Sequence, residues 1–298
     1  MRLIRFVVAV AVLLGVACGE STPTDIGEGG GGRSPSGFDQ PYDDVEVYPV
    51  FVSSEIVVGR NRFLVALNDS QDAPIGSPSV DVDVAFFDLS QSDTEPAFES
   101  ETDFVWTIEP VVGLYVANVE FDSPGKWGAE LTVRGGDVEE TVRGSFEVRA
   151  EPITIGLGEK APATDTPTAD DVKKLSEIST DMHPDPSFYR LSIANAIEQE
   201  QPFVVVFATP KFCTSEVCGP TLDIVKKVAE GFPDLTFIHV EVYENLDDPS
   251  NLRPVPAVRE WRLPSEPWVF VMDARGRVVA KYEGTVAPQE LRPVLQKI

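Results

Sequence analysis

Two cysteines, Cys213 and Cys218, stand five positions apart in the stretch FATPKFCTSEVCGPTLDIVKKVAE. Thiols at this spacing can form a redox-active dithiol, a structural disulfide, or two ligands of a thiophilic metal. The whole chain contains three cysteines. The chemistry open to the pair therefore depends on how the third, Cys18, is used.

The N-terminal residues have the pattern of an export signal. Arg2 and Arg5 precede an apolar stretch that stops at Cys18, which is typical of a signal peptide and short for a bilayer span. The letters GVAC, ending at Cys18, resemble the lipobox of bacterial lipoproteins, in which the cysteine carries diacylglycerol. This resemblance implies a signal peptide over residues 1–17 and lipid attachment at Cys18, with a cleaved soluble signal or an uncleaved anchor as the alternatives. Glycines and serines over residues 18–41 predict a flexible tether.

These features predict an extracytoplasmic protein of the bacterial cell envelope, anchored to the membrane by its lipid. Disulfides persist in such a compartment. With Cys18 assigned to the lipid, Cys213 and Cys218 remain as the two cysteines that can pair with each other.

Helix geometry limits how Cys213 and Cys218 can be joined. Residues three apart on a regular helix lie about 5 Å apart at Cα, whereas residues five apart lie about 8.6 Å apart, outside the disulfide range. A bond between them therefore requires irregular backbone. Either the helix begins at Gly219-Pro220 with both cysteines in a loop, or it begins near Cys213 and must melt locally to oxidise. In both cases Cys213 lies near a helix N-terminus, which favours its thiolate.

Composition excludes one class of partner and predicts two domains. The net charge of -25 repels phosphate backbones, so nucleic acid is not an expected partner. Residues 42–298 exceed the length of one typical domain, and 42% of the residues are hydrophobic, which suffices for two cores.

Residues 42–150 consist of short runs of alternating polar and apolar residues, punctuated by turns, which predicts an antiparallel β-sandwich. The stretch GLYVANVEFDSPGKWGAELTV resembles immunoglobulin-like domains of exported bacterial proteins. We expect this domain to act as a spacer or to bind a partner that the sequence does not identify. Calcium binding by Asp81, Asp83 and Asp88 is an alternative, although the alternation places Asp81 and Asp83 on one solvated face.

The spacing of the apolar residues along the chain changes in residues 151–298. The pattern predicts a mixed α/β domain, with helices at 192–201, 221–232 and 287–298 and strands at 202–210, 235–243, 267–273 and 278–284.

This second half resembles the thioredoxin-like family in the segments AIEQEQPFVVVFATPKFC and AVREWRLPSEPWVFVMDARGRVVAKYEG. The resemblance implies a thiol-disulfide oxidoreductase without a cofactor that acts on protein thiols or disulfides. It puts Cys213 at the nucleophile, Cys218 at the resolving cysteine and Pro267 at the cis-proline that faces them. The chain departs from the family in its longer cysteine spacing, in Phe212 where the family has tryptophan, and in Phe207 where it has a buried aspartate.

Three alternatives remain for the cysteine pair. Cys-Thr-Ser-Glu-Val-Cys is similar to the motif of Q-type peroxiredoxins, although Val206 and Pro210 stand where those enzymes have proline and threonine. Two thiolates with His239 would suit copper, in the manner of Sco-type copper chaperones; the other histidine, His183, has the surroundings of a loop residue. The pair could also be a structural staple in a non-enzymatic module whose sandwich binds a partner.

Overall fold

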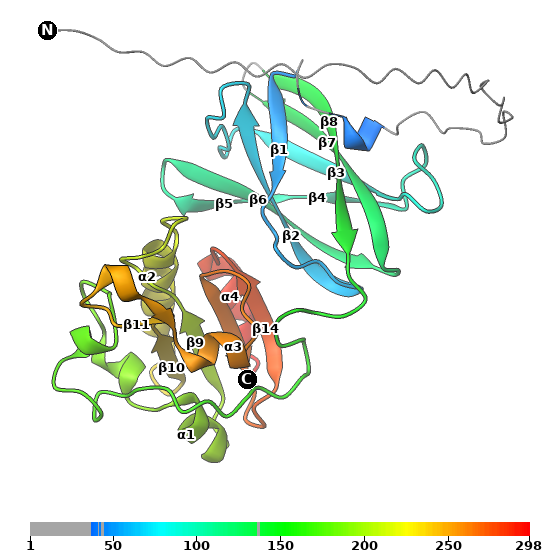
Figure 1. Cartoon of the computed structure of the whole chain (residues 1–298). Coiled ribbons are helices and arrows are strands. Elements are labelled where there is room, and N and C mark those ends of the chain that lie inside the picture. Colours follow the sequence, from blue (N-terminus) through cyan, green and yellow to red (C-terminus); the bar gives the residue numbers. More distant parts are fainter. Residues whose placement is uncertain (1–36, 41, 43–44, 136–137) are drawn as a thin grey trace, which may run out of the picture. The chain divides into compact units, whose positions relative to one another are not determined.

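The computed structural model describes residues 37–40, 42, 45–135 and 138–298. These residues form fourteen strands in four sheets, with few helices (Figure 1). The predicted signal peptide, the lipid site Cys18 and most of the tether lie outside the described residues. Within the described part of the chain, no helix is long and apolar enough to span a bilayer.

The first eight strands form the predicted β-sandwich. One sheet has the strand order β1-β2-β6-β5 and the other β4-β3-β7-β8, and every neighbouring pair is antiparallel. The strands are β1 (Val47–Phe51), β2 (Gly59–Asp69), β3 (Asp81–Asp88), β4 (Phe98–Glu101), β5 (Asp103–Ile108), β6 (Val112–Phe121), β7 (Gly125–Gly135) and β8 (Val138–Val148). The 3-10 helix η1 (Gly37–Asp39) precedes them.

Six alternating runs in the sequence predict β1, β2, β3, β6, β7 and β8, in that order: VEVYPVFVS, RFLVALND, SVDVDVAFFDLS, GLYVANVEF, KWGAELTVRG and TVRGSFEVRA. No such run was identified for β4 or β5. Both lie at the edge of a sheet, where a strand needs fewer apolar residues than at the centre. β4 has only four residues, none of them buried. β5 is short, and its pairing with β6 is irregular between Trp106 and Ile108. Neither strand therefore carries the long alternation by which the other six were predicted.

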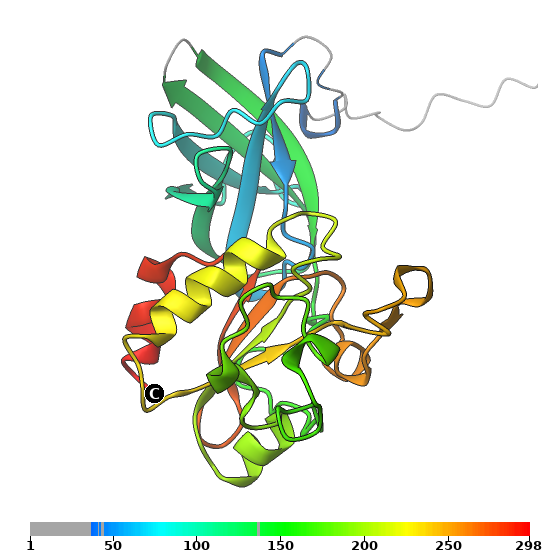
Figure 2. The ribbon, with the colours of Figure 1, turned by 90° about the vertical axis from the view of Figure 1, so that its left-hand side faces the viewer.

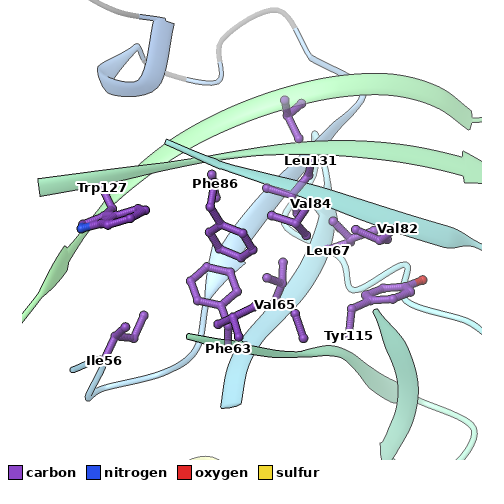
Figure 3. Packing of buried hydrophobic residues seen from close by; sticks show 14 of the residues in the cluster. Ile56, Phe63, Val65, Leu67, Val82, Val84, Phe86, Tyr115, Trp127 and Leu131 are labelled. Carbon is purple, nitrogen blue, oxygen red and sulfur yellow. The ribbon is translucent and has the colours of Figure 1, made fainter. Parts of the chain in front are cut away.

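The sandwich core is rich in aromatic rings (Figure 3). Phe63 of one sheet packs edge-on against Phe86 of the other, with ring centroids 5.1 Å apart. Phe121 packs similarly against Trp127, at 4.9 Å. All four rings are buried, and each such side chain contributes about 1.5–3 kcal/mol by leaving water. These contacts join the two sheets through one hydrophobic core.

The third sheet has the order β10-β9-β13-β14. β9 and β10 are parallel, whereas β13 is antiparallel to both of its neighbours. Every residue of β9 and β13 is buried, as expected for central strands covered on both faces. The strands are β9 (Phe203–Phe207), β10 (Thr236–Val240), β13 (Trp268–Met272) and β14 (Val278–Glu283); β11 (Tyr243–Glu244) and β12 (Arg253–Pro254) form a small fourth sheet.

Helices cover the two faces of the third sheet. One core cluster joins the sheet to α1 and α3, and another joins its opposite face to α2 and α4. Figure 2 shows α2, in yellow, beside α4, in red. The α-helices are α1 (Ile193–Glu198), α2 (Cys218–Ala229), α3 (Pro256–Glu260) and α4 (Pro288–Leu295), and the remaining 3-10 helices are η2 (Leu175–Glu177), η3 (Pro186–Tyr189) and η4 (Pro249–Asn251).

The mixed order of helices and strands predicted for residues 151–298 is therefore present, with helix ends shifted by up to a few residues. The small fourth sheet and the 3-10 helices were not predicted. They are two to four residues long, which is too short for hydrophobic periodicity to reveal them.

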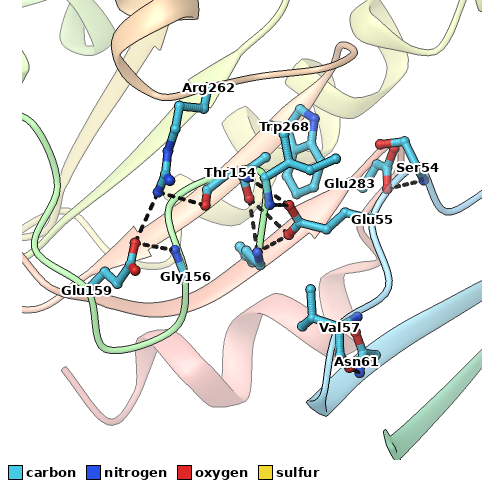
Figure 4. Close-up of polar contacts among 12 residues, drawn as sticks. Ser54, Glu55, Val57, Asn61, Thr154, Gly156, Glu159, Arg262, Trp268 and Glu283 are labelled. Carbon is cyan, nitrogen blue, oxygen red and sulfur yellow. Dashed lines mark hydrogen bonds and ion pairs between the residues drawn. The ribbon is translucent and has the colours of Figure 1, made fainter. Parts of the chain in front are cut away.

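Polar contacts join the segment between β1 and β2 to the second half of the chain, within the compact unit Pro35–Ile298 (Figure 4). The carboxylate of Glu55 pairs with Lys281 of β14 and accepts hydrogen bonds from the Thr154 N–H and hydroxyl, at 2.7 and 3.1 Å. Arg62 of β2 pairs with Glu290 of α4 at 2.6 Å.

Candidate functional site

Cys213 and Cys218 form a disulfide with their Cα atoms 6.0 Å apart, within the range such a bond requires. Cys213 lies in the loop that follows β9, and Cys218 is the first residue of α2. Of the two arrangements derived from the sequence, the structure is nearer the one in which the helix begins at Gly219-Pro220 and both cysteines lie in a loop. The helix starts one residue earlier and includes Cys218.

The backbone between the cysteines is irregular, as helix geometry requires. Glu216 has a φ of 60°, in the left-handed region, and its N–H donates to the Cys213 carbonyl at 3.3 Å. The first regular helical hydrogen bond runs from the Thr221 N–H to the Val217 carbonyl, at 2.9 Å. Pro220 is the third helical residue, where its missing N–H is not needed.

The two sulfurs have different surroundings. Cys213 is partly exposed, whereas Cys218 is fully buried against the α2 side of the sheet. The Cys218 N–H, the first of α2, lies 3.3 Å from the Cys213 sulfur and donates to it. The Ser215 hydroxyl oxygen lies 3.3 Å from the same sulfur. Donors at a helix N-terminus favour a negative charge, so the thiolate is favoured at the more accessible sulfur.

Pro267, the third predicted site residue, immediately precedes β13. The Glu266-Pro267 bond is cis, as predicted, and Glu109-Pro110 is a second cis bond that was not predicted. Trp268 pairs with Phe207, the last residue of β9 before the loop that carries Cys213. The start of β13 and the start of this loop are thus adjacent in the sheet. A contact between Pro267 and Cys213 stays a prediction.

His239, the proposed third copper ligand, is buried in β10 with both ring nitrogens hydrogen-bonded. Nε2 lies 3.0 Å from the Ala208 carbonyl oxygen and Nδ1 lies 2.7 Å from the Tyr189 hydroxyl. Because a carbonyl only accepts, Nε2 carries the proton and the Tyr189 hydroxyl donates to Nδ1. Burial lowers the pKa of His239 to about 4, so the ring is neutral near pH 7 and offers no free nitrogen to a metal.

No group of three or more metal-ligating side chains is found among the described residues. Asp81 and Asp83 lie on the outward face of β3, and Asp83 pairs with Arg134 at 2.6 Å. Asp88 is buried and accepts hydrogen bonds from Ser90 and other side chains of nearby turns. These three carboxylates do not converge, so the arrangement does not support the calcium alternative.

A buried carboxylic acid that the sequence analysis did not single out lies near residues 208–217, the loop between β9 and α2 that carries Cys213 and is called the dithiol loop. Glu241 directly follows β10 and is 4% exposed. Its carboxyl accepts hydrogen bonds from the Thr180 N–H at 2.8 Å and the Thr180 hydroxyl at 2.6 Å. The same hydroxyl accepts from the N–H of Lys211, two residues before Cys213. Burial raises the pKa of Glu241, and the hydrogen bonds from Thr180 offset only part of this effect.

Residues 179–183, called the strap, bring Thr180 to this position. Lys226 of α2 pairs with Asp181 at 2.7 Å and donates to the His183 carbonyl. The Ser179 and Tyr189 hydroxyls are 2.9 Å apart. The strap therefore touches α2, β10 and the dithiol loop. His183 itself is exposed, in keeping with the predicted loop.

Sequence spacing gave no signal for Glu241. Its partner Thr180 is 61 residues away in the chain, and a single glutamate at the end of an apolar strand resembles an ordinary strand end. One clue was available, because Phe237, His239 and Glu241 alternate with apolar residues that face the opposite side.

No protein-family model matches the sequence, and no curated protein matches it.

Proposed function

We propose that the protein is a membrane-anchored, extracytoplasmic thiol-disulfide oxidoreductase in which Cys213 is the nucleophile and Cys218 the resolving cysteine. One observation carries this proposal: the pair combines a partly exposed sulfur at a helix N-terminus with a buried partner in disulfide range. A client disulfide can reach the first sulfur but not the second, which fixes the order of attack.

We further propose that residues 151–298 are a thioredoxin-like domain and residues 42–150 an immunoglobulin-like domain. Support for the first comes from the order β10-β9-β13-β14 with a parallel β9 and β10, and from the cysteines between β9 and α2. Support for the second comes from two antiparallel four-stranded sheets around one core. The sandwich is a spacer or a docking module for a partner still to be identified.

The reaction follows from the two thiols. The Cys213 thiolate attacks a client disulfide, forms a mixed disulfide, and releases one client thiolate, which takes up a proton. Cys218 loses its proton and attacks the Cys213 sulfur, which forms the intramolecular disulfide and releases the second client thiolate. The client disulfide gains two electrons, and the protein dithiol loses two.

The purified full-length protein tests the proposal with dithiothreitol as electron donor and insulin as a model disulfide. Turnover should occur in the wild type, vanish in Cys213→Ser, and stop at a trapped mixed disulfide in Cys218→Ser. Cys18→Ser is the matched control, because it removes the remaining cysteine and should keep full turnover in detergent.

The same samples separate the alternatives. A reduction potential between about -120 and -270 mV would fit an exchange catalyst, whereas a value below about -300 mV would indicate a structural staple. Hydrogen peroxide consumption that exceeds insulin reduction would favour a peroxiredoxin instead. We expect insulin reduction to be faster, since Pro210 stands where peroxiredoxins of this type carry their threonine.

Membrane attachment requires its own test. We expect Cys18→Ala to move the protein from the membrane fraction to the soluble fraction, because acyl chains on Cys18 would be its main attachment. Labelled fatty acid should be incorporated into the wild type alone. Incorporation into the Cys18→Ala protein would refute the assignment of this residue.

A further inference from the structure

A groove of about 910 Å³ lies between the sandwich and the second half of the chain, within the compact unit Pro35–Ile298. Ligand pockets in proteins have volumes of about 300–1,000 Å³. Residues 57–62 and 118–120 line the groove on the sandwich side, and residues 150–152 and 279–283 line it on the other side. None of the lining residues belongs to the dithiol loop or to the strap, so the groove is separate from the cysteine site.

One wall of the groove is the free edge of β14, the last strand in the order β10-β9-β13-β14. The Glu283 carbonyl lies on this edge, where it accepts a hydrogen bond from Arg62 at 3.2 Å. The Gly284 N–H points the other way and donates to the Pro267 carbonyl. Backbone groups of successive residues in an antiparallel strand point to opposite edges. The N–H and carbonyl of Lys281 therefore face the groove.

The chain itself shows that this edge accepts an extended segment. Lys160 forms an antiparallel bridge with Arg277 at the start of β14. The Gly158 N–H donates to the Val278 carbonyl at 2.8 Å. This pairing goes no further: among the described residues, the backbone of residues 279–282 pairs with no strand other than β13. An unpaired edge of this kind is a template for a strand from another chain.

Exposed apolar side chains gather along the same groove. Val58, Leu157 and Val279 are 36%, 44% and 41% exposed, and all three line it. They belong to three segments that are far apart in the sequence. Single exposed apolar residues are ordinary, whereas several that meet at one groove indicate an interaction surface.

The charges of the groove favour a cationic occupant. Its lining includes five glutamates and three basic residues. Two of the three cations are already neutralised, since Lys281 pairs with Glu55 and Arg62 pairs with Glu290. The tether carries more acidic than basic residues, and a second copy of the chain brings a net charge of -25. Both are repelled, so the occupant belongs to a different protein.

We propose that this groove is a docking site for an extended segment of a partner protein, which adds as a strand to the free edge of β14 between Val279 and Glu283. The segment has alternating apolar residues and a lysine or arginine near each end. Backbone hydrogen bonds supply the affinity, and the exposed apolar side chains and the carboxylates select the sequence. The inference goes beyond the proposed thiol-disulfide exchange and does not depend on it.

The experiment uses the purified full-length protein and the fluorescent peptide Lys-Val-Thr-Val-Thr-Val-Lys, blocked at both ends. We expect saturable binding, followed by fluorescence anisotropy, with a Kd below about 1 mM. Hydrogen exchange should show that the bound peptide protects the amide of Lys281, because this N–H faces the groove. Absence of saturable binding up to that concentration, or binding without protection of this amide, would overturn the proposal.

Two N-methylated peptides distinguish strand addition from simple attraction of charges. Methyl groups on alternate amides remove the donors from one edge of the peptide strand only. We expect one of the two complementary peptides to bind within about twofold of the parent and the other at least about tenfold more weakly. Equal affinities of the two would overturn strand addition. A parent peptide with glutamate at both ends should bind at least about tenfold more weakly, and equal binding would overturn the preference for a cationic segment.

Three variants locate the peptide on the protein. We expect Val279→Lys and Leu157→Lys each to weaken binding at least about tenfold, because a lysine there repels the cationic peptide and obstructs the edge. Either variant replaces the other if one fails to fold. Val111→Lys is the matched control, since Val111 is 63% exposed in the turn between β5 and β6 and does not line the groove. It should stay within about twofold, and equal weakening by all three variants would overturn the assignment of the groove.

Cys213→Ser separates this proposal from the oxidoreductase. The peptide contains no cysteine, so this variant should bind it as the wild type does. Loss of binding in Cys213→Ser would place the peptide at the dithiol and overturn the groove. A wild type that binds the peptide at the groove but does not reduce insulin would leave the docking site standing and overturn the exchange activity alone.

Discussion

Glu55 and Glu241 are both buried, with 9% and 4% of their surfaces exposed, but they have different partners. Glu55 faces the ammonium group of Lys281 and accepts from two backbone N–H groups and the Thr154 hydroxyl. Glu241 accepts from Thr180 and from the N–H that follows it. Among the described residues, Glu241 has no ion-pair partner comparable to Lys281.

The difference in partners sets the charge of each acid. Burial raises the pKa of both carboxyls, but at Glu55 the bonds from Lys281 and Thr154 outweigh it and the pKa lies below 4.5. At Glu241 the hydrogen bonds do not outweigh burial, so the pKa lies above 4.5. Burial alone therefore does not determine function. A buried carboxylate paired with a cation is held ionised and stabilises the fold, whereas one with neutral donors alone keeps a raised pKa and can exchange a proton.

The largest expected effect on stability is the loss of the ion pair between Glu55 and Lys281. We expect Glu55→Ala to lower the free energy of unfolding by about 3–5 kcal/mol, because it leaves the largely buried side chain of Lys281 without the carboxylate it pairs with. Urea unfolding measures the change. Glu99→Ala, at an exposed position of β4, is the control and should stay within about 0.5 kcal/mol of the wild type. A loss below about 1 kcal/mol for Glu55→Ala would contradict a stabilising role of the Glu55–Lys281 ion pair.

A smaller loss of stability is expected when the charges of Glu55 and Lys281 are removed together. In the double variant Glu55→Gln, Lys281→Met, the amide oxygen still accepts from Thr154, and no unpaired charge remains. We expect the double variant to recover about 2 kcal/mol or more relative to Glu55→Ala, since the penalty comes mostly from the stranded ammonium group. Equal destabilisation of the two proteins would show that packing of the Glu55 side chain matters instead.

The same contrast explains which features could be predicted from sequence. The cysteine pair, the order of strands around it and the cis bond at Pro267 rest on local patterns or on the family resemblance, and these were predicted correctly. The sandwich was predicted because alternation along β3 and β7 is also local. Glu55 and Glu241 depend on partners that are 226 and 61 residues away, so only the folded chain brings them together.

The copper alternative lost support because it judged a residue by its type alone. His239 has the chemistry of a copper ligand, yet Tyr189, which is 50 residues away, and the carbonyl of Ala208 occupy both nitrogens. Phe207, which departs from the buried aspartate of the thioredoxin-like family, packs on Trp261 with ring centroids 5.0 Å apart.

The smallest expected effect is on the pH dependence of stability, where the two acids should act with opposite sign. The folded pKa of Glu55 is lowered, so its contribution is present above 4.5, the ordinary glutamate value, and is lost as the pH falls through the folded pKa. The folded pKa of Glu241 is raised, so its contribution is present below 4.5 and is lost as the pH rises through the folded pKa.

Urea unfolding of Glu55→Gln and Glu241→Gln between about pH 3 and pH 8 measures both effects. Relative to the wild type, Glu55→Gln should become less stable as the pH rises and Glu241→Gln more stable. If the two differences changed in the same direction with pH, the carboxyls would share one kind of environment, and the contrast between an acid paired with a cation and an acid with neutral donors would fail.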